Sequence, residues 1–533
     1  MIRRAAIAVA ACAAVTVSGC GGGGGEASTT ALTGPDPATL APADAPFFAE
    51  SVVRPQGDAK DAIDGALSKL LATDDPGGFI VDQLDNALAK GHTGLTYERD
   101  VAPWLGERAG VFFETFTDQN ADGAAIVDTT DPAAAQRALD KAAAADKTPE
   151  RTRAYEGVEY KVDRKGTAAG MVGDFAVFGT EVAFRDAVDA SRGSSLADSS
   201  EFRSQLEAGA DDQVAFVYAD PRAVVDALEK SGQVTAAQVS QAGPQLQSLL
   251  SAPAAASVGA TADQVSIEAS AAASSSTPAP HESPLLREFP SDSWFAFASA
   301  DVGRSYGQVL GQGGAAALPR ALGFDLGSEL SQWAGDVGGF VGGTSLFGLG
   351  GALVLETSDE KASARTLANL RDALSRDPSV TVSPLDSPGE QGFSLSPAGV
   401  PIQFQFVQRD GKVLAGLGDS VDQVFSPSST LDDSAAFKTA ADALGGDFSP
   451  VTFLDFGPLT QLIDSFPQAA SDPSFQRAKP YLDHLDYLIA GARSEGSRAA
   501  VRTVLGLKDA PSRAAPSQGS AAAPAVAGPP STP

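Results

Sequence analysis

The sequence predicts an α+β protein with two tandem homologous domains, each an antiparallel sheet packed with helices. Three observations predict this. Short runs alternate apolar and polar residues with a period of two, which is typical of a strand with one buried face. Other runs are Ala-rich or carry apolar residues at helical spacing, and begin at or after a capping aspartate. The order of these motifs in the first half of the chain is repeated in the second half.

The first residues of the chain are typical of a signal peptide. Arg3 and Arg4 precede an apolar stretch over residues 5–17, and a run of small residues follows it. The apolar stretch is shorter than the roughly 20 residues that a membrane span needs. The alternatives are an ordinary secretory signal and an uncleaved anchor. Neither explains why the small residues end in a cysteine followed by five glycines.

The run Val17-Ser18-Gly19-Cys20 resembles the lipobox of bacterial lipoproteins. That resemblance implies cleavage between Gly19 and Cys20, diacylglycerol on the Cys20 thiol and a further acyl chain, commonly palmitate, on the new amino group. Two or more chains anchor a protein stably. We therefore expect a signal peptide over 1–19, an acylated Gly-rich stalk over 20–39, and a position outside the cytoplasmic membrane.

Composition excludes several function classes. The chain has two cysteines, Cys12 in the expected signal peptide and Cys20, so the mature protein has no thiol for a disulfide, a zinc-thiolate site or a nucleophile. Its 38 Lys and Arg residues against 67 Asp and Glu give a net charge of −29. Such an acidic surface repels nucleic acid and anionic lipid headgroups. We expect no nucleic-acid partner and membrane contact through the N-terminal lipid alone.

The internal repeat sets the domain boundaries. The segment Pro103–Val111, with Trp104, matches Gln332–Phe340, with Trp333, and four further pairs of segments match in the same order. These pairs are 44–49 with 292–297, 125–129 with 353–357, 214–221 with 451–458, and 257–260 with 488–492. A repeat this long indicates duplicated domains. We expect repeat units at 40–270 and 285–508.

Local signals place elements within these units. Alternation predicts strands at 158–162 and 402–406, and turn residues predict hairpins at 121–123, 164–166 and 409–411. Asp131-Pro132 and Asp220-Pro221 each predict a helix start, because proline is favoured at the first helical position. Asp58 is expected to head a third helix. Two Ser-, Ala- and Pro-rich stretches predict a linker over 271–284 and a disordered tail over 509–533.

The residues resemble a bacterial family. Leu40–Ala49, Val52–Asp58 and Pro103-Trp104-Leu105-Gly106 are similar to bacterial proteins grouped as domain-of-unknown-function family 3352. The resemblance extends from Leu40 to about Leu507. It implies membership and architecture and no activity, because this family has no established substrate or catalytic residues.

Candidate catalytic residues are few. The three histidines, His92, His281 and His484, have no second histidine at metal-ligand spacing. Ser420 in Gly418-Asp419-Ser420 could be compared with a hydrolase nucleophile, but the matching segment of the first unit is Gly179-Thr180-Glu181. We expect Ser420 to cap a helix or face solvent, away from His484. Trp104 and Trp333 are expected to be buried packing anchors.

One segment resembles half of a calcium loop. Asp118, Asn120 and Asp122 place oxygen ligands at alternate positions before Gly123, but the twelfth position is Thr129 and the flanking elements are expected to be strands. These residues are a weak metal candidate, and a polar hairpin turn explains them better.

The sequence therefore favours a non-enzymatic envelope lipoprotein that binds or scaffolds, without a cofactor. Two alternatives stay open. One is a carrier of an apolar or lipid-like ligand in a cavity between sheet and helices. The other is an envelope hydrolase.

Overall fold

The computed structural model describes residues 32–510, apart from 117–120, 146–150, 210–211, 231, 233, 236–238, 240–249, 274–282, 302–323, 346–347, 386–390, 400–401, 467–470 and 497. The expected signal peptide, Cys20, most of the stalk and most of the linker lie outside the described residues. So does the tail from residue 511. Within the described part, no helix is both long and apolar enough to cross a bilayer.

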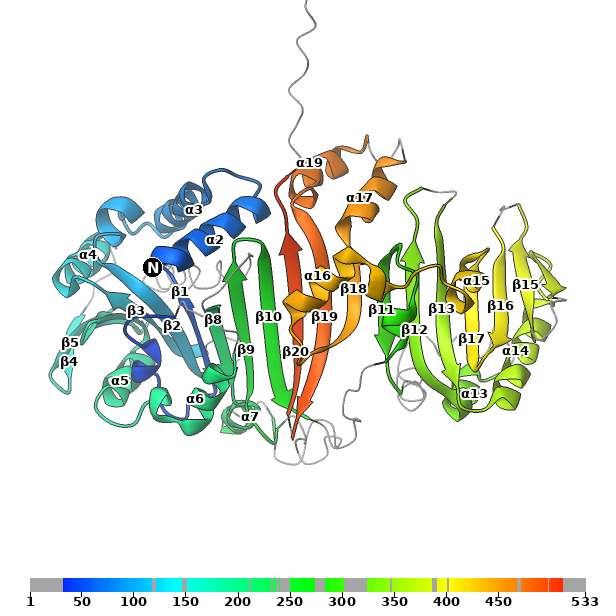
Figure 1. Ribbon diagram of the computed structural model, residues 1–533. Coiled ribbons are helices and arrows are strands. Elements are labelled where there is room, and N and C mark those ends of the chain that lie inside the picture. Colours follow the sequence, from blue (N-terminus) through cyan, green and yellow to red (C-terminus); the bar gives the residue numbers. More distant parts are fainter. Residues whose placement is uncertain are drawn as a thin grey trace, which may run out of the picture.

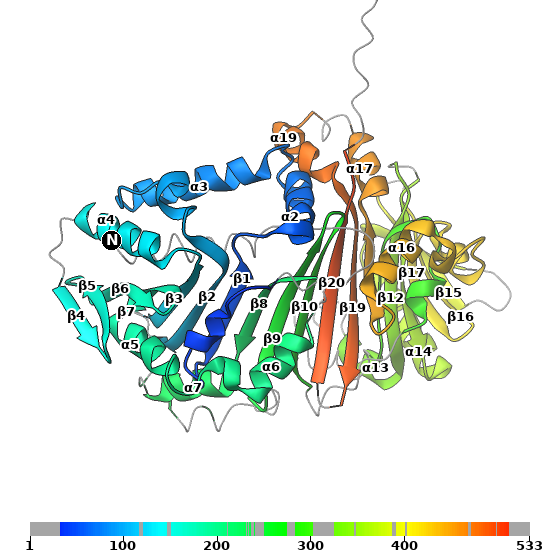
Figure 2. The same ribbon diagram turned by 60° about the vertical axis from the view of Figure 1, so that its left-hand side comes forward.

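Strands of the described residues form one continuous antiparallel sheet of 20 strands, which runs across the whole width of the molecule (Figures 1 and 2). In the first half they are β1 (Phe47–Val52), β2 (Leu105–Phe116), β3 (Ala121–Thr129), β4 (Arg151–Tyr155), β5 (Val158–Val162), β6 (Thr167–Val172), β7 (Phe175–Thr180), β8 (Gln213–Ala219), β9 (Ala254–Thr261) and β10 (Gln264–Ala272). In the second half they are β11 (Ser293–Ser299), β12 (Ala334–Gly342), β13 (Gly350–Thr357), β14 (Val380–Pro384), β15 (Gln391–Pro397), β16 (Phe404–Arg409), β17 (Lys412–Leu417), β18 (Ser449–Asp455), β19 (Leu485–Glu495) and β20 (Arg498–Leu507).

The strand order is the same in both halves. From its free edge inward, the first half reads β4-β5-β6-β7-β3-β2-β1-β8-β9-β10. The second half reads β14-β15-β16-β17-β13-β12-β11-β18-β19-β20. Each strand therefore has a counterpart at the same place in the other half.

The two halves join edge to edge. β10 pairs with β20 along its whole length, from Gln264 opposite Gly506 to Ala272 opposite Arg498. We call this strand pair the seam. Because the pairing continues to Ala272, β10 runs two residues past the expected end of the first unit at residue 270.

Helices lie on both faces of the sheet. In the first half the described helical segments are η1 (Pro37–Leu40), α2 (Gly57–Leu70), α3 (Pro76–Lys90), η2 (Tyr97–Val101), α4 (Pro132–Ala145), α5 (Glu181–Ala190), η3 (Leu196–Asp198), α6 (Ser200–Glu207) and α7 (Pro221–Lys230). In the second half they are α10 (Leu285–Glu288), α13 (Leu326–Trp333), α14 (Glu360–Leu374), α15 (Ser420–Phe425), η5 (Leu431–Asp433), α16 (Ala435–Leu444), α17 (Phe456–Asp464) and α19 (Pro473–Leu482).

Successive side chains along a strand contribute to cores on opposite faces of the sheet. In the first half, Ile126 packs with η1, α5 and α6, whereas its neighbour Val127 packs with α3 and α4. In the second half, Val354 packs with α10, α15 and α16, and the next residue, Leu355, packs with α13 and α14. Successive side chains of a strand point to opposite faces, so each half has helices on both sides.

Most local predictions are confirmed. α4 and α7 begin at Pro132 and Pro221, and α2 begins one residue before Asp58. Asp131 Oδ1 accepts a hydrogen bond from Ala134 N at 2.9 Å, as a helix cap should. The hairpins at 164–166 and 409–411 are present, and the strand expected at 158–162 is β5.

Two local predictions were wrong in their bounds. The hairpin expected at 121–123 is instead the start of β3, because β2 continues to Phe116, which pairs with Ala121. The strand expected at 402–406 begins at Phe404 and leaves Ile402 exposed.

Candidate functional site

Trp104 and Trp333 occupy matching positions, each directly before the second strand of its half. They are 3% and 2% exposed, which confirms the expected burial. Each carbonyl oxygen accepts a backbone hydrogen bond of 2.8 Å, from Thr130 N and from Ser358 N. The indole N–H groups differ in partner: Trp104 donates to the Asp100 carbonyl at 2.6 Å, and Trp333 to Thr366 Oγ1 at 3.0 Å.

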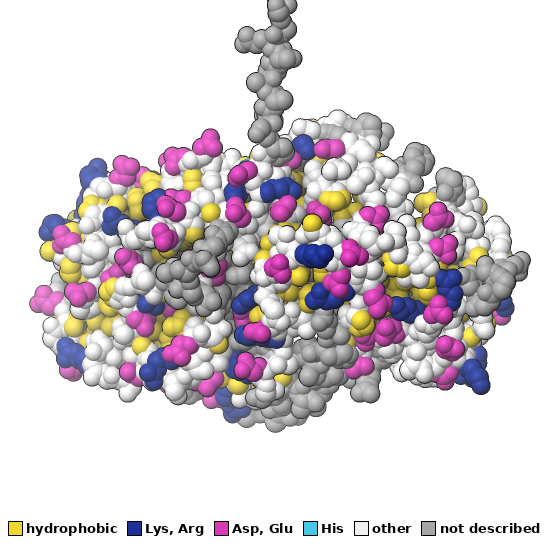
Figure 3. Space-filling view, viewed as in Figure 1, with side chains coloured by type: hydrophobic (Ala, Val, Ile, Leu, Met, Phe, Trp, Pro, Cys, Tyr) yellow, Lys and Arg dark blue, Asp and Glu magenta, His cyan; other side chains and the backbone are white. Residues whose placement is uncertain are grey.

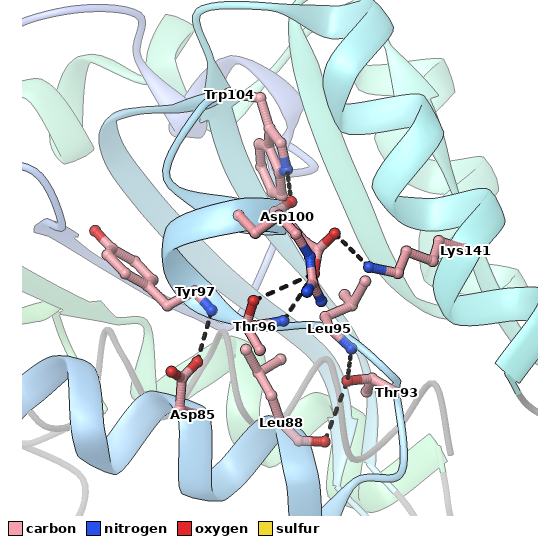
Figure 4. A network of polar contacts seen from close by, with 10 residues as sticks. Asp85, Leu88, Thr93, Leu95, Thr96, Tyr97, Asp100, Trp104 and Lys141 are labelled. Carbon is pink, nitrogen blue, oxygen red and sulfur yellow. Dashed lines mark hydrogen bonds and ion pairs between the residues drawn. The ribbon is translucent and has the colours of Figure 1, made fainter.

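The segment before Trp104 forms a polar network around a single carboxylate (Figure 4). Tyr97–Val101 is a π-helical turn, a rare element that is often found at functional sites. The Asp100 carboxylate accepts hydrogen bonds from Thr96 N at 2.9 Å, Arg99 Nη2 at 2.9 Å and Lys141 Nζ at 2.5 Å. One more bond fixes the turn, from Tyr97 N to Asp85 Oδ1 at 2.6 Å.

These contacts make Asp100 a structural acceptor. Burial acts to raise its pKa, but the hydrogen bonds from Arg99, Lys141 and Thr96 outweigh burial and hold the pKa well below its usual range. A carboxylate held ionised by this many donors is a poor general base. The network instead fixes the π-helical turn between α3, α4 and β2.

A second polar cluster has the opposite character. Glu114 on β2 and Asp186 on α5 share a hydrogen bond, and their pKa values are both raised, that of Glu114 to about 8. Burial is the main cause for both; the Asp186 charge raises the pKa of Glu114 further, whereas the hydrogen bond with Glu114 opposes the shift of Asp186. The negative charges of Asp44 and Asp122 raise both values further. The pair therefore holds a proton near neutral pH.

Of the three residues that form the weak metal candidate, the structure describes only Asp122. Asp118 and Asn120 lie outside the described residues, and Asp122, near the Glu114 pair, accepts a hydrogen bond from Thr115 Oγ1 at 3.0 Å. In the described part of the chain, no group of three His, Cys, Asp or Glu side chains is placed to hold a metal ion. The lipidation and cleavage residues Cys20 and Gly19 also lie outside the described residues.

A buried ion pair lies beneath the first described residues. Arg108 donates to Glu50, which is fully buried, and to Asp36 Oδ1 at 3.2 Å. Burial raises the pKa of Glu50 to about 7, although the Arg108 charge opposes the shift. Thr33 Oγ1 also donates to Glu107 Oε2 at 2.8 Å. These contacts fix residues 33–36 onto the sheet, so the last part of the stalk expected over 20–39 belongs to the folded body.

The seam carries a third charged cluster. Glu268 of β10 is buried and accepts hydrogen bonds from Arg493 Nη2 at 2.8 Å and from Arg502 Nη2 at 2.6 Å. The guanidinium carbons of Arg493 and Arg502 lie 4.7 and 4.6 Å from the centre of the Phe448 ring. Arg502 Nη1 also donates to the Leu444 carbonyl at the end of α16. The cluster thus joins β10 of the first half to β19, β20 and α16 of the second.

The expectation for Ser420 was wrong in part. Ser420 is the first residue of α15, but its hydroxyl is buried and neither caps the helix nor faces solvent. Its Oγ accepts a hydrogen bond from Gly351 N at 2.8 Å, because the β13–β17 register brings this helix start against β13. His484 lies elsewhere in the second half, where Nδ1 is 3.1 Å from the Lys508 carbonyl oxygen.

The second half exposes a group of large apolar side chains. Four of the large apolar side chains that are exposed among the described residues lie on or beside β13 and β16, which are separated by β17: Leu349, Leu353, Ile402 and Phe404. We call these four residues the apolar patch. Leu353 lies opposite Ala415 of β17, Ala415 lies opposite Phe406 of β16, and Phe404 is two residues before Phe406. Leu353 and Phe404 therefore share one face of the sheet.

The counterpart of Leu353 in the first half is buried. Ala125 of β3 lies opposite Phe178 of β7, as Leu353 of β13 lies opposite Ala415 of β17. Ala125 is 5% exposed and Leu353 is 41% exposed. A larger apolar side chain is thus left in water at the position where the other half buries a smaller one. On the face shown in Figure 3, Asp and Glu side chains are spread over the surface and do not gather in one region.

Sequence reasoning missed the buried charges. Glu50 and Glu268 are single carboxylates within otherwise apolar or small-residue strands. A lone charge in such a strand is the signal that could have marked both, because ionised groups are rarely buried without a partner.

An α+β architecture with one large antiparallel sheet defines the class of protein only broadly. The family model described as "Protein of unknown function (DUF3352)" matches residues 80–502. The chain therefore belongs to the DUF3352 family, as the sequence resemblance implied.

Other comparisons add little. No curated protein sequence matches. Among solved structures, TP0453 in crystal form III has 10% identity and a TM-score of 0.24, and the match covers 46% of this chain and 82% of that one. TP0453 in crystal form I has 11% identity and a TM-score of 0.24, with 46% and 81% covered.

Proposed function

We propose that the chain is an extracytoplasmic lipoprotein, cut between Gly19 and Cys20 and held to a membrane by lipid on Cys20. The lipobox-like sequence supports this. The contacts at the start of the described chain support it too, because Arg108 and Glu107 hold residues 33–36, within the expected stalk, on the sheet. The lipid would thus tether a body that begins only a dozen residues further on.

The test of the anchor is Cys20→Ser. The variant should lose acylation and leave the membrane fraction, because no described helix can take over the anchoring. Detergent phase partitioning and intact-mass measurement of the mature chain check this. A variant that stays in the membrane fraction would refute the lipoprotein proposal.

The two tandem homologous domains, over 40–270 and 285–508, are also part of the proposal. The matching strand order of the two halves and the equivalent positions of Trp104 and Trp333 support a duplicated unit.

The biochemical role that we propose is binding an apolar partner, without catalysis. The apolar patch carries this proposal, since Leu353 and Phe404 expose large apolar side chains on one face of the sheet, and exposed apolar surface marks interaction sites. A lipid-like ligand is the second candidate, and the same patch favours it because the expected anchor would hold the patch close to a lipid source.

Binding can be tested with a fluorescent fatty acid. The double variant Leu353→Gln/Phe404→Gln should bind the probe at least tenfold more weakly than the wild type. The control is Phe79→Gln, which removes an exposed apolar side chain from α3, outside the patch. Equal affinities in the three proteins would remove the patch from the proposal. Labelling of Ser420 by a fluorophosphonate would instead favour the hydrolase alternative.

A further inference from the structure

The strand β4 is a free edge of the sheet. It pairs with β5 on one side, and its other side faces outward at one end of the molecule (Figure 2). The side chains of Arg151, Thr152, Arg153 and Ala154 are exposed, and that of Tyr155 is half-buried. An exposed edge is a template for a further strand, because its outward backbone groups have no partner in the sheet.

The turn after β4 determines which backbone groups face outward. Glu156 and Gly157 have φ values of 48° and 79° and form a two-residue hairpin loop between Tyr155 and Val158. The two residues that flank such a loop form a hydrogen-bonded pair, and the pairs then alternate along the ladder. Arg151, Arg153 and Tyr155 therefore direct their backbone groups toward β5. Thr152 and Ala154 direct theirs outward.

The opposite edge of the sheet is less suited to strand addition. β14 ends in Pro384, which lacks an N–H group, and it has no charged residue. Proline on an edge strand discourages further pairing. Strand β4 contains no proline.

The basic residues around β4 favour an acidic strand as its partner. The segment 151–165 contains five basic residues and three acidic ones, in a chain whose net charge is −29. Arg151 and Arg153 lie on the same face of β4, and Arg153 Nη1 donates to Glu181 Oε1 at 2.7 Å. A second copy of this edge would bring arginines against arginines, which is unfavourable, whereas an acidic strand would meet opposite charge.

We propose that β4 is a strand-addition site for an extended acidic segment of another protein. The added strand pairs with the outward N–H and C=O groups of Thr152 and Ala154. Its carboxylates occupy alternate positions, opposite Arg151 and Arg153. This site is separate from the apolar patch, so the strand-addition proposal does not depend on the proposed function.

The probe for this site is an eight-residue capped peptide that alternates Glu with Thr or Val, labelled for fluorescence anisotropy. It is titrated against the mature chain carrying Cys20→Ser. The expected result is saturable binding that weakens with salt, and binding at least tenfold weaker for the same peptide with Lys in place of Glu. Equal binding of the two peptides would overturn the acidic partner.

Two paired measurements test the edge itself. Thr152→Pro removes an outward N–H without removing a bond to β5, and should weaken binding at least tenfold, whereas Thr152→Val keeps the N–H and should bind like the wild type. N-methylation of the peptide at its Thr and Val positions should abolish binding to the wild type, whereas N-methylation at its Glu positions should not.

If Thr152→Pro does not fold, the N-methylated peptides still test whether β4 accepts an added strand. Binding that tolerates both methylation patterns would overturn strand addition. Self-association of the wild type that is lost in Thr152→Pro, measured by analytical ultracentrifugation, would show a second copy at this edge and would also overturn the proposal.

Discussion

Glu268 and Arg502 lie directly opposite each other in the seam, at equivalent positions of the two halves. Each follows a two-residue hairpin turn by the same distance. Gln264 pairs with Thr261 across the first turn and Arg498 with Glu495 across the second, and Glu268 and Arg502 are each four residues further along. The strand pairing of the seam is therefore symmetric about this pair, where one half supplies an acid and the other a base.

The first prediction concerns this pair. Glu268→Gln leaves Arg493 and Arg502 without their shared counter-charge in a largely buried place, so the free energy of unfolding should fall by about 3 kcal/mol. Urea denaturation of the mature chain measures it. The control is Glu201→Gln, an exposed residue 3.9 Å from Arg498, which should cost less than about 1 kcal/mol. Equal losses would show that Glu268 does not hold the seam.

A second prediction concerns Asp100 and pH. Its pKa is lower in the folded protein than in the unfolded chain, so its stabilising effect is full above the unfolded pKa, near 4, and is lost as the pH falls through the folded value. Asp100→Asn should therefore cost about 1.5–3 kcal/mol at pH 7 and less at pH 2. Urea titrations at both pH values check this, with the exposed Asp61→Asn as control. A pH-independent cost would contradict it.

A third prediction concerns Glu114, whose pKa is raised to about 8. The folded state keeps a proton that the unfolded chain releases near pH 4.5, so this group lowers stability as the pH rises from about 4.5 toward 8. Asp186→Asn removes the neighbouring carboxylate and should lower the pKa of Glu114 and flatten this decline. Carbon-13 NMR titration of the Glu114 carboxyl measures the pKa directly.

The control for Glu114 is Asp189→Asn. Asp189 interacts with Asp186 by charge and accepts a hydrogen bond from the Tyr155 hydroxyl at 2.9 Å, so its removal should shift Glu114 less. An unchanged Glu114 pKa in the Asp186 variant would show that burial alone causes the shift.

The fourth prediction concerns Ser420. Ser420→Ala deprives Gly351 N of its buried acceptor and should lower the free energy of unfolding by about 1–2 kcal/mol. It should leave binding of the fluorescent fatty acid unchanged. Ser331→Ala, at an exposed serine of α13, should cost much less. Loss of binding in the Ser420 variant would show that this residue does more than join α15 to β13.

Local sequence signals predicted the elements but not their long-range pairing. Asp131-Pro132 and Asp220-Pro221 predict helix starts because capping is decided within one turn of helix. Likewise the alternation at 158–162 predicts β5. The pairing of β10 with β20 joins residues more than 200 positions apart, and no local pattern specifies it.

The candidate sites show the same limit. Ser420 was expected to cap a helix because α15 starts there, but its true partner, Gly351, comes from the β13–β17 register. The buried role of Glu268 depends on Arg493 and Arg502, which reach it only once the seam has formed. The burial of Trp104 and Trp333 could be predicted because large repeated aromatic residues are commonly packed in a core.

The charges in the seam also determine which two halves can pair through these edge strands. Two first halves joined through β10 would place Glu268 against Glu268, and two second halves joined through β20 would place Arg502 against Arg502. Like charges directly opposite each other destabilise a strand pair. Only the pairing of β10 with β20 places a carboxylate opposite a guanidinium. Glu268 and Arg502 therefore favour the pairing of unlike halves. The same charge pairing would act between halves of different molecules, so Glu268 and Arg502 favour a first half joined to a second half over two like halves joined together.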